Sequence, residues 1–242
     1  MYSFDGRVRY SECDEDGVLT LYSMMNYLQD CSTFHSEAVH RGLKELNHDH
    51  LGWFVTSWLI QIYDMPRFTD DITISTWCYD LKSIRASRAF RIADEQGNTR
   101  VLADSQWCLF NFQEKKVVTI GEPDRVYLED TPRPDLPKIS RRLAPSSDAA
   151  GQSTRPIVVT EQYLDTNRHV NNAEYLRFSI GAADAAGYSA DPTRLDIQYR
   201  EMALLGDTIQ PVVFPEGDGA CTVSLNAASG KPYAIVRLGA IK

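Results

Sequence analysis

The residues best suited to chemistry in this chain lie close together, between Asp165 and Asn172. A carboxylate, a carboxamide and an imidazole alternate at Asp165, Asn167 and His169. In an extended segment alternate side chains point the same way, so we expect these three to face one substrate. An unperturbed histidine titrates near pH ~6.5, so His169 could take a proton from water as a general base.

A helix is predicted directly after these residues. Asn171 and Asn172 are good N-cap residues, and residues 173–178 continue as a helical pattern. The start of a helix presents unpaired N–H groups and a positive dipole end, which suit an oxyanion. A general base beside such a site is the minimum equipment for hydrolysing an acyl bond. The alternative is a polar loop in which Asn and Asp side chains only make the turn.

The pattern D-x-N-x-H-V-N-N at residues 165–172 resembles the signature of acyl-acyl carrier protein (ACP) thioesterases. Further stretches are similar to that family, in the same order and spacing: residues 8–14, 63–66 leading to 72–77, and 197–199 running to 206–207. The resemblance implies an α+β chain with a tandem (double) hot-dog fold, each half a long helix wrapped by an antiparallel sheet. It also implies catalytic roles for Asn167 and His169 and a supporting role for Asp165.

The family pattern places a further glutamate three residues after a tyrosine, which is Met202 when counted from Tyr199. Methionine cannot move a proton, and Glu201 is one residue early. In a regular strand Glu201 shares a face with Tyr199 and could substitute, and a β-bulge would also re-aim it. The alternative is that Glu201 faces solvent. Ala203 stands where some members are described with a cysteine, so no cysteine nucleophile is expected.

The chain repeats itself, because the stretch R-Y-S-E-C-D-E-D-G-V-L at residues 9–19 corresponds to E-Q-Y-L-D-T-N-R-H-V at 161–170. Aligning Asp14 with Asp165 gives an offset of 151 residues. In each copy a helical pattern and then β-like runs follow, and matching Tyr63 with Tyr199 pairs Asp71 with Asp207. The first copy has Asp16 and Val18 in place of Asn167 and His169, so we expect it to bind the acyl chain without catalysing.

A proline-rich stretch separates the copies. We predict an N-terminal domain at 1–125, a linker at 126–156 and a catalytic C-terminal domain at 157–242. The best basic cluster for docking a carrier lies here or at its edge, formed by Arg133, Lys138, Arg141 and Arg142. A second basic group is formed by Lys82, Arg85 and Arg88. Such clusters are usually only a solvated face.

Composition excludes several classes of function. The net charge of −8 argues against nucleic acid as a partner, and no apolar run is long enough for a membrane span. Five scattered cysteines without a C-x-x-C pair, and no visible signal peptide, predict a cytoplasmic protein with reduced thiols. His48 and His50 are spaced like metal ligands, but no third ligand is in view. No metal or organic cofactor is expected.

The sequence therefore predicts hydrolysis of fatty acyl-ACP thioesters, with His169 as base, Asn167 positioning the reacting groups and Glu201 as a substitute carboxylate. Asn171 and Asn172 are expected at the oxyanion site. An acyl-CoA thioesterase and a non-catalytic acyl-binding protein remain as alternatives. Acyl chain length stays open, as does whether the chain forms a homodimer.

Overall fold

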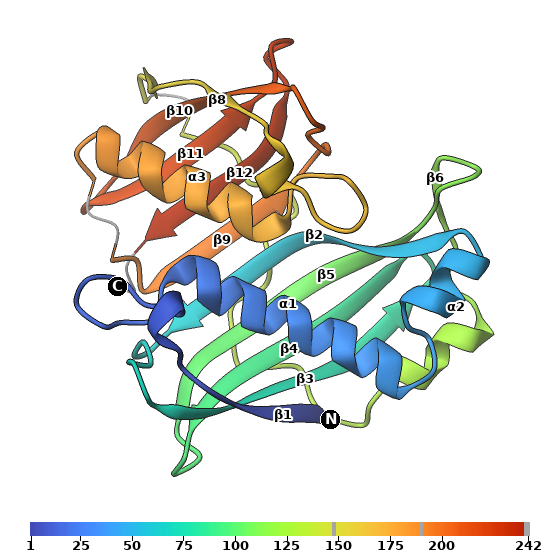
Figure 1. Cartoon of the computed structure of the whole chain (residues 1–242). Helices are drawn as coiled ribbons and strands as arrows, with labels where there is room; N and C mark the ends of the chain where they lie inside the picture. Colours follow the sequence, from blue (N-terminus) through green and yellow to red (C-terminus); the bar gives the residue numbers. More distant parts are fainter. Residues whose placement is uncertain (147–148, 189–190, 240–242) are drawn as a thin grey trace. The chain divides into compact units, whose positions relative to one another are not determined.

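The computed structural model describes residues 1–146, 149–188 and 191–239. The chain divides into two compact units, Met1–Ile139 and Ser140–Lys242. Figure 1 shows that each unit is a helix lying across an antiparallel sheet, which is the predicted α+β architecture. None of the helices in the described ranges is both long and apolar enough to cross a membrane.

The first unit contains an antiparallel sheet in the order β1-β3-β4-β5-β2, with the short β6 paired to β5. Its strands are β1 (Tyr2–Arg7), β2 (Leu51–Ile62), β3 (Asp71–Lys82), β4 (Arg85–Asp94), β5 (Thr99–Asn111) and β6 (Lys116–Val118). The long strands contain runs of consecutive buried residues, such as Trp58, Leu59 and Ile60 of β2, so residues on both faces of the sheet are covered in its middle.

Helix α1 (Leu21–Ala38) covers that sheet (Figure 1). The apolar period of three and four residues predicted it, and its buried face includes Met24, Leu28 and Cys31. Thr20 caps the helix, because its hydroxyl oxygen accepts a hydrogen bond from the Ser23 amide at 3.2 Å. A shorter helix, α2 (Leu43–His48), follows before β2.

The second unit contains a sheet in the order β9-β12-β11-β10, and the short strands β7 and β8 both pair with β10. Its strands are β7 (Gln152–Ser153), β8 (Ile157–Val158), β9 (Arg194–Tyr199), β10 (Thr208–Gly217), β11 (Ala220–Asn226) and β12 (Pro232–Gly239). Helix α3 (Asn172–Ala185) packs on this sheet through residues such as Leu176 and Ala183. Gly187, at φ +86°, follows its last turn, and this left-handed conformation favours glycine.

The internal repeat holds at the level of backbone geometry. A 3-10 turn at Tyr10–Glu12 recurs at Glu161–Tyr163, and the isolated β-bridge between Cys13 and Leu19 recurs between Leu164 and Val170. Each pair of equivalent residues is 151 positions apart, which is the predicted offset.

After the helices, equivalent residues of the two units are 137 positions apart. Asp207 is therefore equivalent to Asp70, and the predicted pairing with Asp71 is wrong by one residue. The Asp70 carboxylate accepts a hydrogen bond from the Arg67 amide at 2.8 Å, and Asp207 accepts one from the Leu204 amide at 2.9 Å. The carbonyls of Asp70 and Asp207 likewise accept from Val8 and Val159. The first unit is therefore longer by 14 residues here (151 − 137), in the segment that contains α2.

The predicted linker, residues 126–156, is divided between the two units at Ile139 and Ser140. On the first unit, the indole N–H of Trp77 donates to the Pro132 carbonyl at 2.9 Å, and Leu136 is buried. In the second unit, the Leu143 amide donates to the Gln198 side chain at 3.0 Å. These residues are held by the unit to which they belong.

Candidate active site

Residues 165–169 form a closed turn. The Asp165 amide donates to the His169 carbonyl at 2.8 Å, and the Arg168 amide donates to the Asp165 carbonyl at 3.0 Å. The prediction of an extended segment was therefore wrong. Asx-type turns are a known preference of aspartate, and here that local preference overrides the alternation of the sequence.

Asp165 uses its carboxylate to hold this turn together. Its Oδ1 accepts hydrogen bonds from the amides of Asn167 at 2.8 Å and His169 at 3.3 Å. In the first unit, Asp14 accepts from the amides at positions 16 and 18 in the same way, at 3.0 and 2.9 Å. The first unit has Val18 in place of the histidine, yet its aspartate accepts the same two amides. These hydrogen bonds therefore hold the turn and do not depend on the imidazole. Asp165 thus orients the backbone on either side of Asn167 and His169.

Asn167 and His169 lie in the part of the turn that precedes α3. The Asn167 side chain is exposed and the His169 imidazole is half-buried. His169 is followed by Val170, whose amide donates to the Ala203 carbonyl at 3.1 Å. The turn is thus fixed on one side by Asp165 and on the other by residues that follow β9.

The start of α3 supplies an amide that could stabilise an oxyanion. Asn171 is the N-cap, and its side-chain oxygen accepts from the Ala173 amide at 3.0 Å. The carboxamide oxygen of Asn171 therefore caps the helix. The amide of Asn172 has no hydrogen-bond acceptor within the described ranges, so it is the better candidate of the two predicted residues.

Glu201 and Met202 lie beyond the end of β9, which stops at Tyr199. The amides of Arg200 and Glu201 both donate to the Tyr233 carbonyl, at 2.7 and 3.2 Å, and this two-to-one pairing is the geometry of a β-bulge. The regular strand considered from sequence does not extend to Glu201. Both Glu201 and Met202 are exposed, Met202 to 42%. The Ala203–Val170 hydrogen bond nevertheless brings this segment to the residue beside His169.

Two tyrosine hydroxyls that sequence reasoning missed tie this segment to the start of α3. The Tyr175 hydroxyl accepts from the Ala203 amide at 2.9 Å, and the Tyr199 hydroxyl donates to the Asn172 carbonyl at 3.1 Å. The two rings also pack edge to face, 5.7 Å apart. By the two offsets, the first unit has Met24, Ile62 and Pro66 at the positions of Tyr175, Tyr199 and Ala203. Met24 and Ile62 have no hydroxyl, and Pro66 has no amide hydrogen to donate, so neither bond can form in the first unit.

A buried carboxylate also lies in the first turn of α3. Glu174 is 2% exposed, and its Oε2 lies 2.6 Å from the Arg177 guanidinium. Arg177 also lies over the Tyr163 ring at 5.5 Å. Burying a carboxylate needs a paired charge, and Arg177 supplies it. The equivalent residue of the first unit is Ser23, so a comparison of the two copies would have singled out this position.

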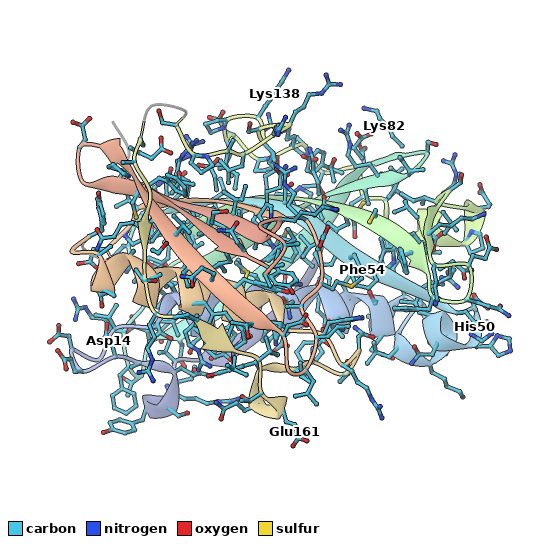
Figure 2. The ribbon with its side chains drawn as sticks, turned by 90° about the horizontal axis from the view of Figure 1, so that it is seen from above. Asp14, His50, Phe54, Lys82, Lys138 and Glu161 are labelled. Atoms are coloured by element: carbon cyan, nitrogen blue, oxygen red, sulfur yellow. The ribbon has the colours of Figure 1, made fainter. Side chains whose placement is uncertain are left out.

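The predicted docking cluster is only partly available for a partner. Arg133 donates to the Asp104 carboxylate at 3.3 Å and to the carbonyls of Leu136 and Pro137 at 2.9 and 2.6 Å, so it secures the chain on the first unit. Lys138, Arg141 and Arg142 are exposed. In the second basic group, Arg88 is buried and donates to Thr76 and His35, which removes it from the surface. Lys82 and Lys138 project outward on the same side in Figure 2.

His48 and His50 do not take part in a metal site that the described residues could form. His48 pairs with Asp49 at 3.2 Å, and Figure 2 shows His50 at the outer end of the first unit. All five cysteines are free thiols.

Comparison with known proteins identifies the family. The model of the acyl-ACP thioesterase N-terminal domain matches residues 2–126, and that of the C-terminal domain matches residues 147–231. The chain is 24% identical over 227 residues to the chloroplastic oleoyl-ACP thioesterase of Coriandrum sativum, covering 87% of this chain and 62% of the relative. It is 25% identical over 184 residues to oleoyl-ACP thioesterase 1 of Arabidopsis thaliana, covering 70% of this chain and 51% of the relative. The chain thus spans about half to three fifths of the curated relatives' length.

Solved structures show the same fold along nearly the whole chain. A putative oleoyl thioesterase from Lactobacillus plantarum superposes with a TM-score of 0.81 at 25% identity, covering 98% of this chain and 94% of that one. An acyl-ACP thioesterase from Bacteroides thetaiotaomicron gives a TM-score of 0.85 at 20% identity, covering 98% and 96%. With both family models and both units accounted for, this chain belongs to the acyl-ACP thioesterase family and has its double hot-dog fold.

Proposed function

We propose that this protein hydrolyses fatty acyl-ACP thioesters to free fatty acid and carrier protein. The observation that supports the proposal best is the difference between the two copies of one turn. Asp14 and Asp165 build the same backbone, but only the second copy carries a carboxamide and an imidazole on it. Family membership supports the same reaction.

In this mechanism His169 takes a proton from water, and the resulting hydroxide attacks the thioester carbonyl carbon. Asn167 holds the reacting groups through its amide, and the Asn172 amide at the start of α3 donates to the oxyanion. Collapse of the tetrahedral intermediate breaks the C–S bond, and the proton held by His169 passes to the leaving thiolate. Glu201 is proposed as an auxiliary carboxylate after the bulge. The first unit is proposed to bind the acyl chain, and the protein to work in the cytoplasm.

Turnover of acyl-ACP by His169→Ala tests this assignment. General-base catalysis contributes about 10²- to 10⁴-fold, so kcat should fall by that factor while the thermal unfolding temperature stays near the wild-type value. His48→Ala, which removes an 88% exposed imidazole of the first unit, is the matched control and should keep full activity. A His169→Ala rate above half of wild type would exclude this histidine as the base.

Two further assays separate the alternatives. Comparative kinetics on acyl-ACP and acyl-CoA should favour the carrier protein, and a preference for CoA would change the substrate class. A wild-type protein that binds acyl thioesters without turnover would be an acyl-binding protein, the reading favoured by the exposed position of Glu201 and by Met202. Loss of rate in Glu201→Gln would place that carboxylate in the reaction.

A further inference from the structure

The exposed apolar side chains of the second unit are gathered in one place. Every large apolar residue that is exposed in the described part of this unit lies in segment 200–206, which follows β9, or in the strand β8 beside it. These residues, here called the apolar patch, are 42–58% exposed: Val158, Met202, Leu204 and Leu205. The amide and carbonyl of Val159 bond to Asp207 and Gly206, which holds the two segments side by side. Single exposed apolar residues are ordinary, whereas a group of them marks an interaction surface.

The first unit shows that the fold does not require the apolar patch. The turns that carry Arg67 and Leu204 close in the same way, each with a hydrogen bond from that residue's amide to an aspartate. By the two offsets, Arg67 stands at the position of Leu204, and Arg7 at that of Val158. Both arginines are exposed, and Arg7 pairs with Asp71 at 2.6 Å. Charged residues at these positions are thus compatible with the fold, and the second unit has apolar ones instead.

The apolar patch adjoins the proposed reaction site. Ala203 stands between Met202 and Leu204, and its carbonyl accepts a hydrogen bond from the amide of Val170, the residue after His169. A thioester that reaches His169 is attached to its carrier protein. The surface of that carrier therefore comes within the length of its pantetheine arm from this turn.

The charges beside the apolar patch suit an acidic partner. Segment 200–206 contains one acid, Glu201, and one base, Arg200, so the segment itself is neutral. The Arg200 guanidinium donates to the Leu143 carbonyl at 3.0 Å, which places the exposed Arg141 and Arg142 alongside the segment. The local charge is thus positive in a chain whose net charge is −8. Complementary charges orient a partner, and apolar contacts at the centre of an interface supply most of its affinity.

We propose that the acyl carrier protein docks on the apolar patch, with Arg141 and Arg142 at the rim of the interface. This assignment rests on the proposed function, and it names the surface through which the partner of that site is held. An apolar part of the carrier covers the four side chains, and its acidic residues face the two arginines. The pantetheine arm then extends from the docked carrier to the turn of His169.

The test compares acyl-ACP with a small substrate, the same acyl group on pantetheine. From wild type to Leu204→Asn/Leu205→Asn, kcat/KM for acyl-ACP should fall about tenfold relative to kcat/KM for acyl-pantetheine. The loss should lie in KM, because docking precedes the reaction. It should also persist at high salt, since apolar contacts are not screened as exposed charges are, and this separates the patch from the arginines at its rim.

Phe68→Asn is the matched control, because Phe68 is the first-unit counterpart of Leu205 and is 47% exposed. It should leave the ratio at the wild-type value. Calorimetric titration with the holo-carrier, which has the arm but no acyl group, measures docking without turnover. The double variant should bind the holo-carrier about tenfold more weakly than wild type. Failure of hydrolysis and failure of docking are thereby distinguished.

Three results would overturn the docking surface. The first is an unchanged ratio in the double variant. The second is an equal loss with both substrates, which would place the patch against the arm or the acyl group. The third is a wild-type dimer in sedimentation that the double variant dissociates, which would assign the patch to a second copy of this chain.

Discussion

At the scale of single residues, Asp14 and Asp165 have the same structural role, but only the turn of Asp165 carries the proposed catalytic residues. Each accepts two backbone hydrogen bonds inside its own turn. A carboxylate occupied in this way is poorly placed to act as a base, because its acceptor oxygen already binds amides. The role that we assign to Asp165 is therefore to position Asn167 and His169.

Replacing each aspartate by alanine should show this separation. Asp14→Ala and Asp165→Ala should lower the free energy of unfolding by similar amounts, about 1–2 kcal/mol, since each leaves two amides without their acceptor. Only Asp165→Ala should also lower kcat, by at least tenfold. Chemical denaturation and steady-state kinetics of both variants measure the two effects. Equal activity in the two variants would contradict the positioning role.

At the scale of elements, α3 is joined to the segment after β9 by hydroxyl groups that the first unit lacks. Tyr175 accepts from the Ala203 amide, and the Ala203 carbonyl accepts from Val170. The amide and the carbonyl of Ala203 are thus both hydrogen-bonded, the amide to α3 and the carbonyl to the turn that carries His169. Burial raises the pKa of Tyr175 well above its ordinary value, so the hydroxyl keeps its proton at every physiological pH.

Tyr175→Phe tests whether this bond positions the site. The variant should lose about 1–3 kcal/mol of stability, because the buried Ala203 amide is left without an acceptor. It should also lower kcat more than it changes KM, since the turn before α3 loses one of its supports. Met24→Leu, at the equivalent position of the first unit, is a control that should leave kcat at the wild-type value. An unchanged kcat in Tyr175→Phe would show that this tyrosine contributes to packing and does not position the site.

A second property at the element scale is a buried imidazole between α1 and the sheet of the first unit. His35 is 3% exposed, and its Nδ1 lies 2.9 Å from the Arg88 guanidinium, which donates to it. Burial and the nearby Arg88 charge lower the pKa of His35 to about 4. The folded protein therefore keeps this histidine neutral where the unfolded chain protonates it.

Stability should consequently fall on acidification. Between pH ~6.5, the ordinary histidine pKa, and about 4, only the unfolded state binds the proton, so unfolding is favoured as pH drops through this window. The contribution of neutral His35 to the free energy of unfolding is fully present above pH ~6.5. About 2–3 kcal/mol of it is lost by pH ~4.5. Denaturation of wild type and His35→Gln at pH 7 and 4.5 measures it. The variant should lose less stability than wild type, and an equal loss in both would assign the effect to other groups.

At the scale of the whole molecule, binding of the proposed acidic carrier would have to overcome a net charge of −8. With Arg133 engaged by Asp104, the exposed pair Arg141 and Arg142 remains from the predicted cluster, together with Lys138. Arg141→Ala/Arg142→Ala should raise KM for acyl-ACP and leave kcat nearly unchanged. The effect should weaken as salt rises, because exposed charges are screened over about 8 Å at physiological ionic strength.

Kinetics at low and high salt measure this prediction. Lys44→Ala, which removes an exposed lysine of α2, is a control for the change in net charge. An unaltered KM at low salt would exclude the two arginines as the docking site.

Local sequence patterns predicted most of the fold, because caps and periodicity act over short distances. Asn171 caps α3 as predicted, and the three- and four-residue apolar period predicted α1, whose cap is Thr20. What failed depended on particular hydrogen bonds, local at Asp165 and Asp70 and between distant segments at Arg133, that the order of residue types does not reveal. The turn at Asp165 closes on itself, the one-residue shift at Asp70 follows from its bond to Arg67, and Arg133 is recruited by Asp104.

The candidate site was predicted in its residue types but not in its geometry. Asn167 and His169 are recognisable from the motif, and their roles remain proposals. Tyr175 and Tyr199 gave no signal, since a buried tyrosine in a helix or strand is usually part of the core. The internal repeat could have found them, through comparison of each residue with its counterpart in the first copy, at an offset of 151 for Tyr175 and of 137 for Tyr199.

The duplicated turn also makes the protein its own reference sample. Two loops with the same aspartate, the same hydrogen bonds and a left-handed residue at the same position occur in one polypeptide, at one concentration and one pH. In a nuclear magnetic resonance titration, the amides of Asp16 and Val18 would report every change common to such a loop. Subtracting their shifts from those of Asn167 and His169 would isolate the ionisation of a single imidazole, without a mutation and without a second protein.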